Sequence, residues 1–134
     1  MKTLKSAIVG AVSGIVLSSY SAQAADKVQL EGATVGHWTM DYAAAVKLAA
    51  EKELPLILNF TGSDWCGWCQ LMDKNVFAKA EWKKFAADNA VLVTLDFPQD
   101  SSIVPEKYVA RNEQLKNQFQ VQGYPTYVIL DSDG

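Results

Sequence analysis

The chain has 134 residues, of which 49% are apolar and 20% are charged, as is typical of a single globular domain. It has 12 basic and 15 acidic residues and a net charge of −3, so it lacks the strongly basic surface that nucleic-acid binding requires. The composition is also unlike that of collagen, a coiled coil or a disordered chain.

The first 24 residues have the pattern of a secretory signal peptide. Lys2 and Lys5 give a positive start, residues 7–17 form an apolar run, and the small-x-small cleavage signature Ala22-Gln23-Ala24 follows. The apolar run is far shorter than the roughly 20 residues that span a bilayer, which argues against a transmembrane anchor. We therefore expect cleavage after Ala24, a periplasmic or secreted protein, and no stable insertion in the membrane.

A polar leader covers residues 25–37, and within it Val28-Gln29-Leu30 fits a short edge strand. The main domain is expected over residues 38–134, beginning with a helix from Thr39 to Glu53. Apolar side chains of this helix recur at steps of three and four residues: Trp38, Tyr42, Val46 and Ala49. Pro55 ends this helix.

The next apolar run, Leu56 to Phe60, is typical of a strand buried on both faces. The turn residues Thr61-Gly62-Ser63-Asp64 follow it, and a helix is expected to open around Cys66. A further helical segment runs from Lys79 to Asp88. We expect three of its side chains to face the core: Trp82, Phe85 and Ala86.

The second half of the chain continues the alternation. It has a strand from Ala90 to Leu95, a loop from Asp96 to Pro105, a helix from Tyr108 to Gln118 and a strand from Thr126 to Leu130. Helices and strands that alternate in this way indicate an α/β sheet covered by helices. The closing residues 131–134 have hairpin-turn composition, so we expect a further strand and a terminal helix beyond them.

The two cysteines, Cys66 and Cys69, lie three positions apart. On a helix this spacing places both thiols on one face, where a disulfide can close and open. At the helix start, free N–H groups and the helix dipole stabilise a thiolate, the attacking species in disulfide exchange. Asp64 opposes this with a negative charge nearby. The sequence therefore predicts redox chemistry at Cys66, with Cys69 one turn deeper.

A metal site is the main alternative for a Cys-x-x-Cys motif. A structural zinc site requires four ligands, and His37 is the single histidine, far from the pair in sequence. Covalent haem attachment requires a histidine directly after the second cysteine, where this chain has Gln70. A surface or capping role therefore suits His37 better than catalysis, and Asp96 is expected to serve its loop rather than chemistry.

The segment Ser63-Asp64-Trp65-Cys66-Gly67-Trp68-Cys69, after a buried strand, resembles the active-site segment of the thioredoxin superfamily. It is especially similar to exported bacterial thioredoxin-like domains with a Cys-Gly-Trp-Cys centre. A second signature, Gly123-Tyr124-Pro125-Thr126, resembles the cis-proline loop of that family. The resemblance covers residues 38–134 and implies a central mixed sheet flanked by helices, truncated here before the last strand and helix.

The resemblance also implies roles for individual residues. Cys66 would be the nucleophile and Cys69 the resolving thiol. Pro125 would be cis, and substrate would lie against five residues: Trp65, Gly67, Trp68, Tyr124 and Pro125. No metal or organic cofactor is implied. The partners would be proteins that carry disulfides or dithiols, and a membrane or soluble thiol electron donor.

Three departures from the family pattern stand out. Asn59 takes the place of a buried aspartate that serves proton transfer in many thioredoxins, and a neighbouring lysine has no match in the strand at residues 90–95. The dipeptide between the cysteines is Gly-Trp, which leaves the direction of electron flow open. The sequence thus predicts a thiol–disulfide oxidoreductase, with a reductase or relay role favoured. The alternatives are a non-enzymatic peptide-binding or chaperone module, argued from Asn59, and a metal carrier.

Overall fold

A computed structural model describes residues 27–134 of the protein. The expected signal peptide, residues 1–24, lies outside the described residues. The elements in chain order are β1 (Trp38–Thr39), α1 (Tyr42–Lys52), β2 (Leu56–Thr61), α2 (Gly67–Met72), the π-helical turn η1 (Asp73–Phe77), α3 (Ala80–Asn89), β3 (Val91–Asp96), α4 (Glu106–Gln118) and β4 (Thr126–Leu130).

The strands form one mixed sheet in the order β1-β3-β2-β4. β1 and β2 run parallel to β3, and β4 runs antiparallel to β2. The mixed sheet flanked by helices confirms the expected fold class. Within the described residues β4 forms one edge of the sheet, and the expectation of a further strand beyond residue 134 stays a prediction.

The expected helix from Thr39 begins later than predicted. Asp41 caps α1, because its Oδ1 accepts a hydrogen bond from the Ala44 N–H at 3.1 Å. Trp38 was wrongly assigned to the helix face and instead lies in β1, which pairs with β3. Gln29, in the expected edge strand, makes a single parallel bridge with Thr39.

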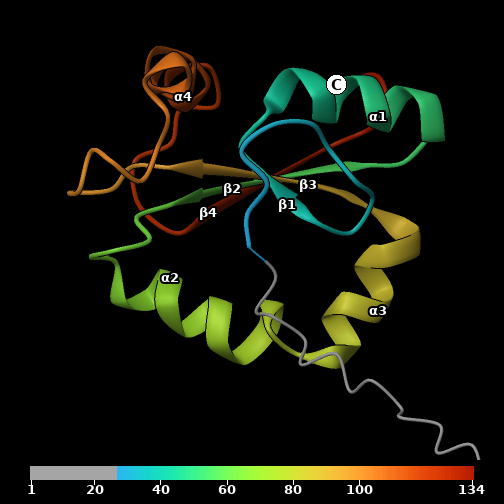
Figure 1. The fold of residues 1–134 in the computed structure, drawn as a ribbon, viewed down its shortest axis with the longest axis horizontal. Coiled ribbons are helices and arrows are strands. Elements are labelled where there is room, and N and C mark those ends of the chain that lie inside the picture. Colours follow the sequence, from blue (N-terminus) through green and yellow to red (C-terminus); the bar gives the residue numbers. More distant parts are fainter. Residues whose placement is uncertain (1–26) are drawn as a thin grey trace, which may run out of the picture.

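The helices cover both faces of the sheet (Figure 1): α1 and α4 lie on one side, and α2, η1 and α3 lie on the other. Side chains of β2 and β3 alternate between the two faces. The α1 side holds the main core, where Ala45 and Ala49 of α1 and Leu115 of α4 pack against the sheet. The strand residues of this core are Leu56, Leu58, Phe60, Val91, Val93 and Leu95.

The opposite face of the sheet begins apolar and becomes polar along the strands. Ile57 and Leu92 pack with Trp82 and Ala86 of α3. Toward the carboxyl ends of β2 and β3, the register pairs Asn59 with Thr94 and Thr61 with Asp96. We call these four buried side chains, Asn59, Thr61, Thr94 and Asp96, the polar floor. The helix that begins at the cysteines lies on this face (Figure 1).

Phe85 was wrongly placed in the core. Trp82 and Ala86 stand one helical turn apart and face the sheet, so Phe85 is turned outward and keeps 51% of its surface exposed. Its ring still lies 5.9 Å from that of Trp82, in an aromatic group that includes Trp38 and Phe77.

Among residues 27–134, no helix is long and apolar enough to cross a membrane.

Candidate active site

The two cysteines lie where β2 gives way to α2. Cys66 is the N-cap residue, with extended backbone angles, and Cys69 lies in the first turn of α2. The pair forms a disulfide with a Cα–Cα distance of 5.2 Å, and both residues are buried. The Cys69 N–H donates a hydrogen bond to Cys66 Sγ at 3.2 Å. The same geometry stabilises a thiolate on Cys66 once the disulfide is reduced.

The loop that precedes Cys66 is held against the segment that follows β3. The Asp96 carboxylate accepts hydrogen bonds from the Ser63 N–H, at 3.0 Å, and from the Ser63 hydroxyl. The indole N–H of Trp65 donates to the Phe97 carbonyl at 2.8 Å. Sequence reasoning assigned Asp96 to its loop and missed its function as an anchor of the active-site turn, because that function depends on the register of β2 and β3.

Asp64 is held by the same segment. Its carboxylate accepts hydrogen bonds from the backbone N–H groups of Gln99, at 2.9 Å, and Asp100, at 2.8 Å. The bond from Asp100, followed by that from Gln99, lowers the pKa of Asp64. The negative charge beside the cysteines is therefore stabilised by backbone dipoles and serves to tie two loops together.

An aromatic wall stands beside the cysteine turn. The rings of Trp65 and Tyr124 meet edge to face, with centroids 5.7 Å apart, and Phe97 lies 5.3 Å from Tyr124. The Tyr124–Pro125 bond is cis, as the resemblance to the thioredoxin superfamily implied. A Cβ on Gly62 would overlap the Trp65 ring, so glycine at this position allows the indole to lie over the turn.

Trp68 and Gly67 are the outermost residues of the site. Trp68 is 73% exposed, and nothing lies within 4 Å of the position that a Cβ on Gly67 would occupy. The structure therefore brings Trp65 and Tyr124 together, leaves Cys66 and Cys69 buried, and turns Trp68 toward solvent.

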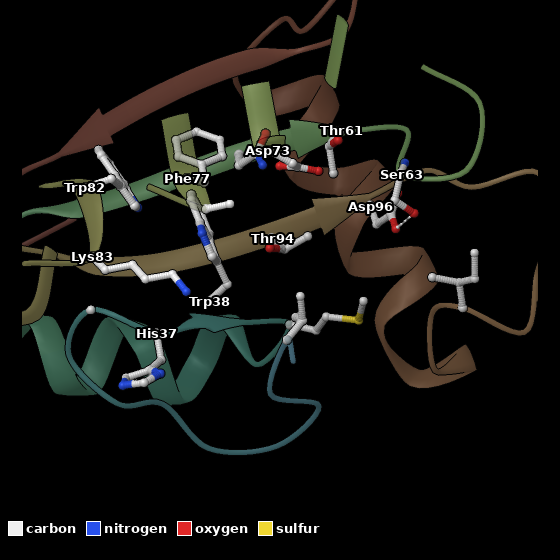
Figure 2. A pocket seen from close by; sticks show the side chains of 16 residues that line it. His37, Trp38, Thr61, Ser63, Asp73, Phe77, Trp82, Lys83, Thr94 and Asp96 are labelled. Carbon is white, nitrogen blue, oxygen red and sulfur yellow. Dashed lines mark hydrogen bonds between the residues drawn. The ribbon is translucent and has the colours of Figure 1, made fainter. Parts of the chain in front are cut away.

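A cavity of about 430 Å³ lies between the polar floor and the helical segments η1 and α3 (Figure 2). Its apolar side is formed by Trp38, Phe77 and Trp82. Asn59 Oδ1 and Thr61 Oγ1 are buried in its wall and have no hydrogen-bond partner within the described residues. Buried polar atoms of this kind are normally satisfied by water.

Asp73 also lines this cavity, and sequence reasoning missed it. Loss of hydration, and then the nearby charge of Asp96, raise the pKa of the Asp73 carboxyl. Loss of hydration and the charge of Asp73 in turn raise the pKa of Tyr127 on β4. The available signal was the position of Asp73, one turn after Cys69.

His37 is exposed and lines the same cavity. Among residues 27–134, no group of three or more His, Cys, Asp or Glu side chains is arranged to hold a metal ion.

Comparison with known proteins shows the family to which this chain belongs. A family model described as thioredoxin-like matches residues 37–132. A protein named disulfide bond reductase DsbH, from Chlamydia pneumoniae, is 39% identical over 93 residues, which cover 69% of this chain and 55% of that protein. The thioredoxin-related protein DsbJ of the same organism is 31% identical over 96 residues, or 72% of this chain and 27% of DsbJ. The chain thus spans about half, or less, of the length of these two relatives.

Solved structures agree with these relatives. A structure described as DsbH oxidoreductase has a TM-score of 0.67 and 35% identity, and the match covers 91% of this chain and 78% of that one. A thioredoxin from Thermus thermophilus has a TM-score of 0.52 at 22% identity, covering 69% of this chain and 62% of that chain, and supports the fold alone.

Proposed function

Because the chain belongs to the thioredoxin-like family, we propose that it is a thiol–disulfide oxidoreductase that exchanges disulfides with protein substrates. The observation that carries this proposal is the Cys66–Cys69 disulfide at the start of α2, with the Cys69 N–H directed at Cys66 Sγ. A pair held in this way can alternate between dithiol and disulfide with little change in the backbone.

In the reducing direction, the Cys66 thiolate attacks one sulfur of a substrate disulfide. A mixed disulfide forms between Cys66 and the substrate, and the other substrate sulfur leaves as a thiolate. Cys69 then loses its proton and attacks Cys66 Sγ, which closes the Cys66–Cys69 disulfide and releases the second substrate sulfur. Two electrons pass from the protein to the substrate, so a thiol electron donor must reduce the pair before the next cycle.

Substrate is proposed to lie across the open side of the cysteine turn. The Tyr124 backbone, next to cis Pro125, would pair with an extended substrate segment, with the Trp65 ring beside it. Gly67 leaves room for a close approach of substrate backbone, and the exposed Trp68 offers apolar surface next to the disulfide.

We further propose that the protein acts as a reductase or electron relay in the periplasm or after secretion. The name disulfide bond reductase of the 39% identical relative supports this direction, and the signal-peptide pattern of residues 1–24 supports export. The electron donor would be a membrane or soluble thiol protein, and the substrates would be exported proteins that carry disulfides.

The reduction potential of the Cys66–Cys69 pair tests both the activity and its direction. The purified protein is equilibrated against glutathione buffers, and the oxidised fraction is read from tryptophan fluorescence or thiol alkylation. We expect a potential near that of thioredoxin, about −270 mV. A potential near about −120 mV would instead indicate that the protein oxidises its substrates. If no reversible couple is found, the protein would be interpreted as a binding module and not as an enzyme.

A further inference from the structure

We propose that Asp73 accepts the proton of the Cys69 thiol through water in the cavity above the polar floor, and so activates the resolving cysteine. This inference rests on the proposed thiol–disulfide exchange. It assigns to η1 a function that the strand residue Asn59 cannot perform, because an amide accepts no proton at neutral pH.

The backbone places Asp73 on the same helix face as Cys69. η1 continues directly from α2, and the Asp73 N–H donates to the Cys69 carbonyl. Residues four apart on such a helix stand one above the other. Cys69 is only 2% exposed, so its thiol faces the protein interior, and Asp73 is the next residue along that face.

The cavity brings water to the Asp73 carboxylate. On this helix its lining begins at Asp73, one turn after Cys69. Figure 2 shows the Asp73 carboxylate pointing along the cavity toward Thr61. Thr61 and Asn59 are buried in the cavity wall, and Thr61 Oγ1 and Asn59 Oδ1 have no hydrogen-bond partner among residues 27–134. A volume of about 430 Å³ holds several waters, each of which needs two to four polar partners. The polar floor and Asp73 provide those partners.

The charges around Asp73 suit a proton acceptor. Asp96 on β3 and Tyr127 on β4 flank it, and Lys83 on α3 and His37 before β1 line other parts of the cavity. Partial desolvation and the charge of Asp96 raise the pKa of Asp73 above that of an ordinary carboxyl. A general base works best when its pKa approaches the working pH, so this shift favours the function.

The step balances without a further reactant. The Cys69 S–H bond breaks and its proton passes through cavity water to the Asp73 carboxylate. The Cys69 thiolate then attacks Cys66 Sγ of the mixed disulfide, an S–S bond forms between the two cysteines, and the substrate leaves as a thiolate. Asp73 later returns the proton to solvent through its exposed side.

The test follows the second step alone. Reduced protein is mixed with excess oxidised glutathione, and the release of glutathione from the Cys66 mixed disulfide is measured by stopped-flow fluorescence and acid quench from pH 4 to pH 9. Variants are Asp73→Asn and Asp73→Glu, and Asp88→Asn, on the exposed surface of α3, is the matched control. We expect Asp73→Asn to slow release by about tenfold to a hundredfold at pH 7.

A merely structural contribution of Asp73 would lower the rate at all pH values alike. We expect instead that Asp73→Asn removes the acidic limb of the pH profile, that Asp73→Glu restores part of it, and that Asp88→Asn leaves it unchanged. An unaltered profile in Asp73→Asn overturns the proposal.

Carboxyl NMR separates this inference from the proposed function. In the wild-type protein the Asp73 carboxyl is titrated in the oxidised and reduced states. Because coupled groups share their titration steps, we expect the apparent pKa of Asp73 to differ between the two states. Identical titrations overturn the inference even if exchange is fast. A wild-type protein that forms no mixed disulfide refutes the proposed function, and the NMR comparison still decides whether Asp73 and Cys69 are coupled.

Discussion

Replacement of Asp96 by alanine tests whether this buried carboxylate anchors the active-site turn. The Asp96→Ala change removes the acceptor of two hydrogen bonds from Ser63. Hydrogen bonds to a charged group contribute about 1.5–3 kcal/mol each, and the loss is offset in part because a buried charge is no longer desolvated. We expect a net loss of about 2–4 kcal/mol, which leaves a domain of ordinary stability folded.

Urea denaturation of the oxidised protein measures this loss. With a slope of about 2 kcal/mol per molar urea, a loss of about 2–4 kcal/mol should lower the midpoint by roughly 1–2 M. Asp100→Ala is the matched control, because the exposed Asp100 carboxylate accepts hydrogen bonds from Ser102 within its own loop. Its midpoint should stay within about 0.3 M of wild type, as for most surface substitutions. Equal midpoints in the two variants would refute the anchoring function of Asp96.

Three further substitutions probe the loops and the open surface. Gly62→Ala drives a methyl group into the Trp65 ring, so we expect a changed tryptophan emission and altered thiol reactivity, and unchanged spectra would contradict the packing. Gly36 has a φ of +78°, and an added Cβ would lie 2.5 Å from the Ala87 backbone. Gly36→Ala should therefore lower stability by about 1–3 kcal/mol, and no loss in thermal melts would contradict this. Trp68→Ala should keep stability and exchange with small disulfides but slow exchange with a protein disulfide, and equal slowing of both would argue against substrate contact.

Much of the fold follows from local sequence. β2 and β3 are apolar runs bounded by turn residues, and both strands were predicted to within a residue or two. Cys66 was expected at a helix start and is the N-cap of α2. These features were accessible because the apolar pattern and the turn residues act over only a few neighbouring positions.

Other features depend on partners that are distant in sequence. β1 has two residues and exists because β3 offers it backbone partners, so no periodic pattern marks it. Phe85 has an apolar side chain at a plausible spacing, yet the orientation of α3 turns it outward. The neighbourhood of Asp96 and Asp73 depends on the register of β2 and β3 and on the π-helical turn, neither of which the local sequence specifies.

Trapping of the mixed disulfide tests the central claim most directly, namely that Cys66 attacks and Cys69 resolves. The Cys69→Ser and Cys66→Ser variants are incubated with a disulfide-containing protein such as insulin and analysed by non-reducing electrophoresis and mass spectrometry. The account predicts a stable mixed disulfide through Cys66 in Cys69→Ser and no adduct in Cys66→Ser. Adducts of equal yield in both variants, or in neither, would contradict it.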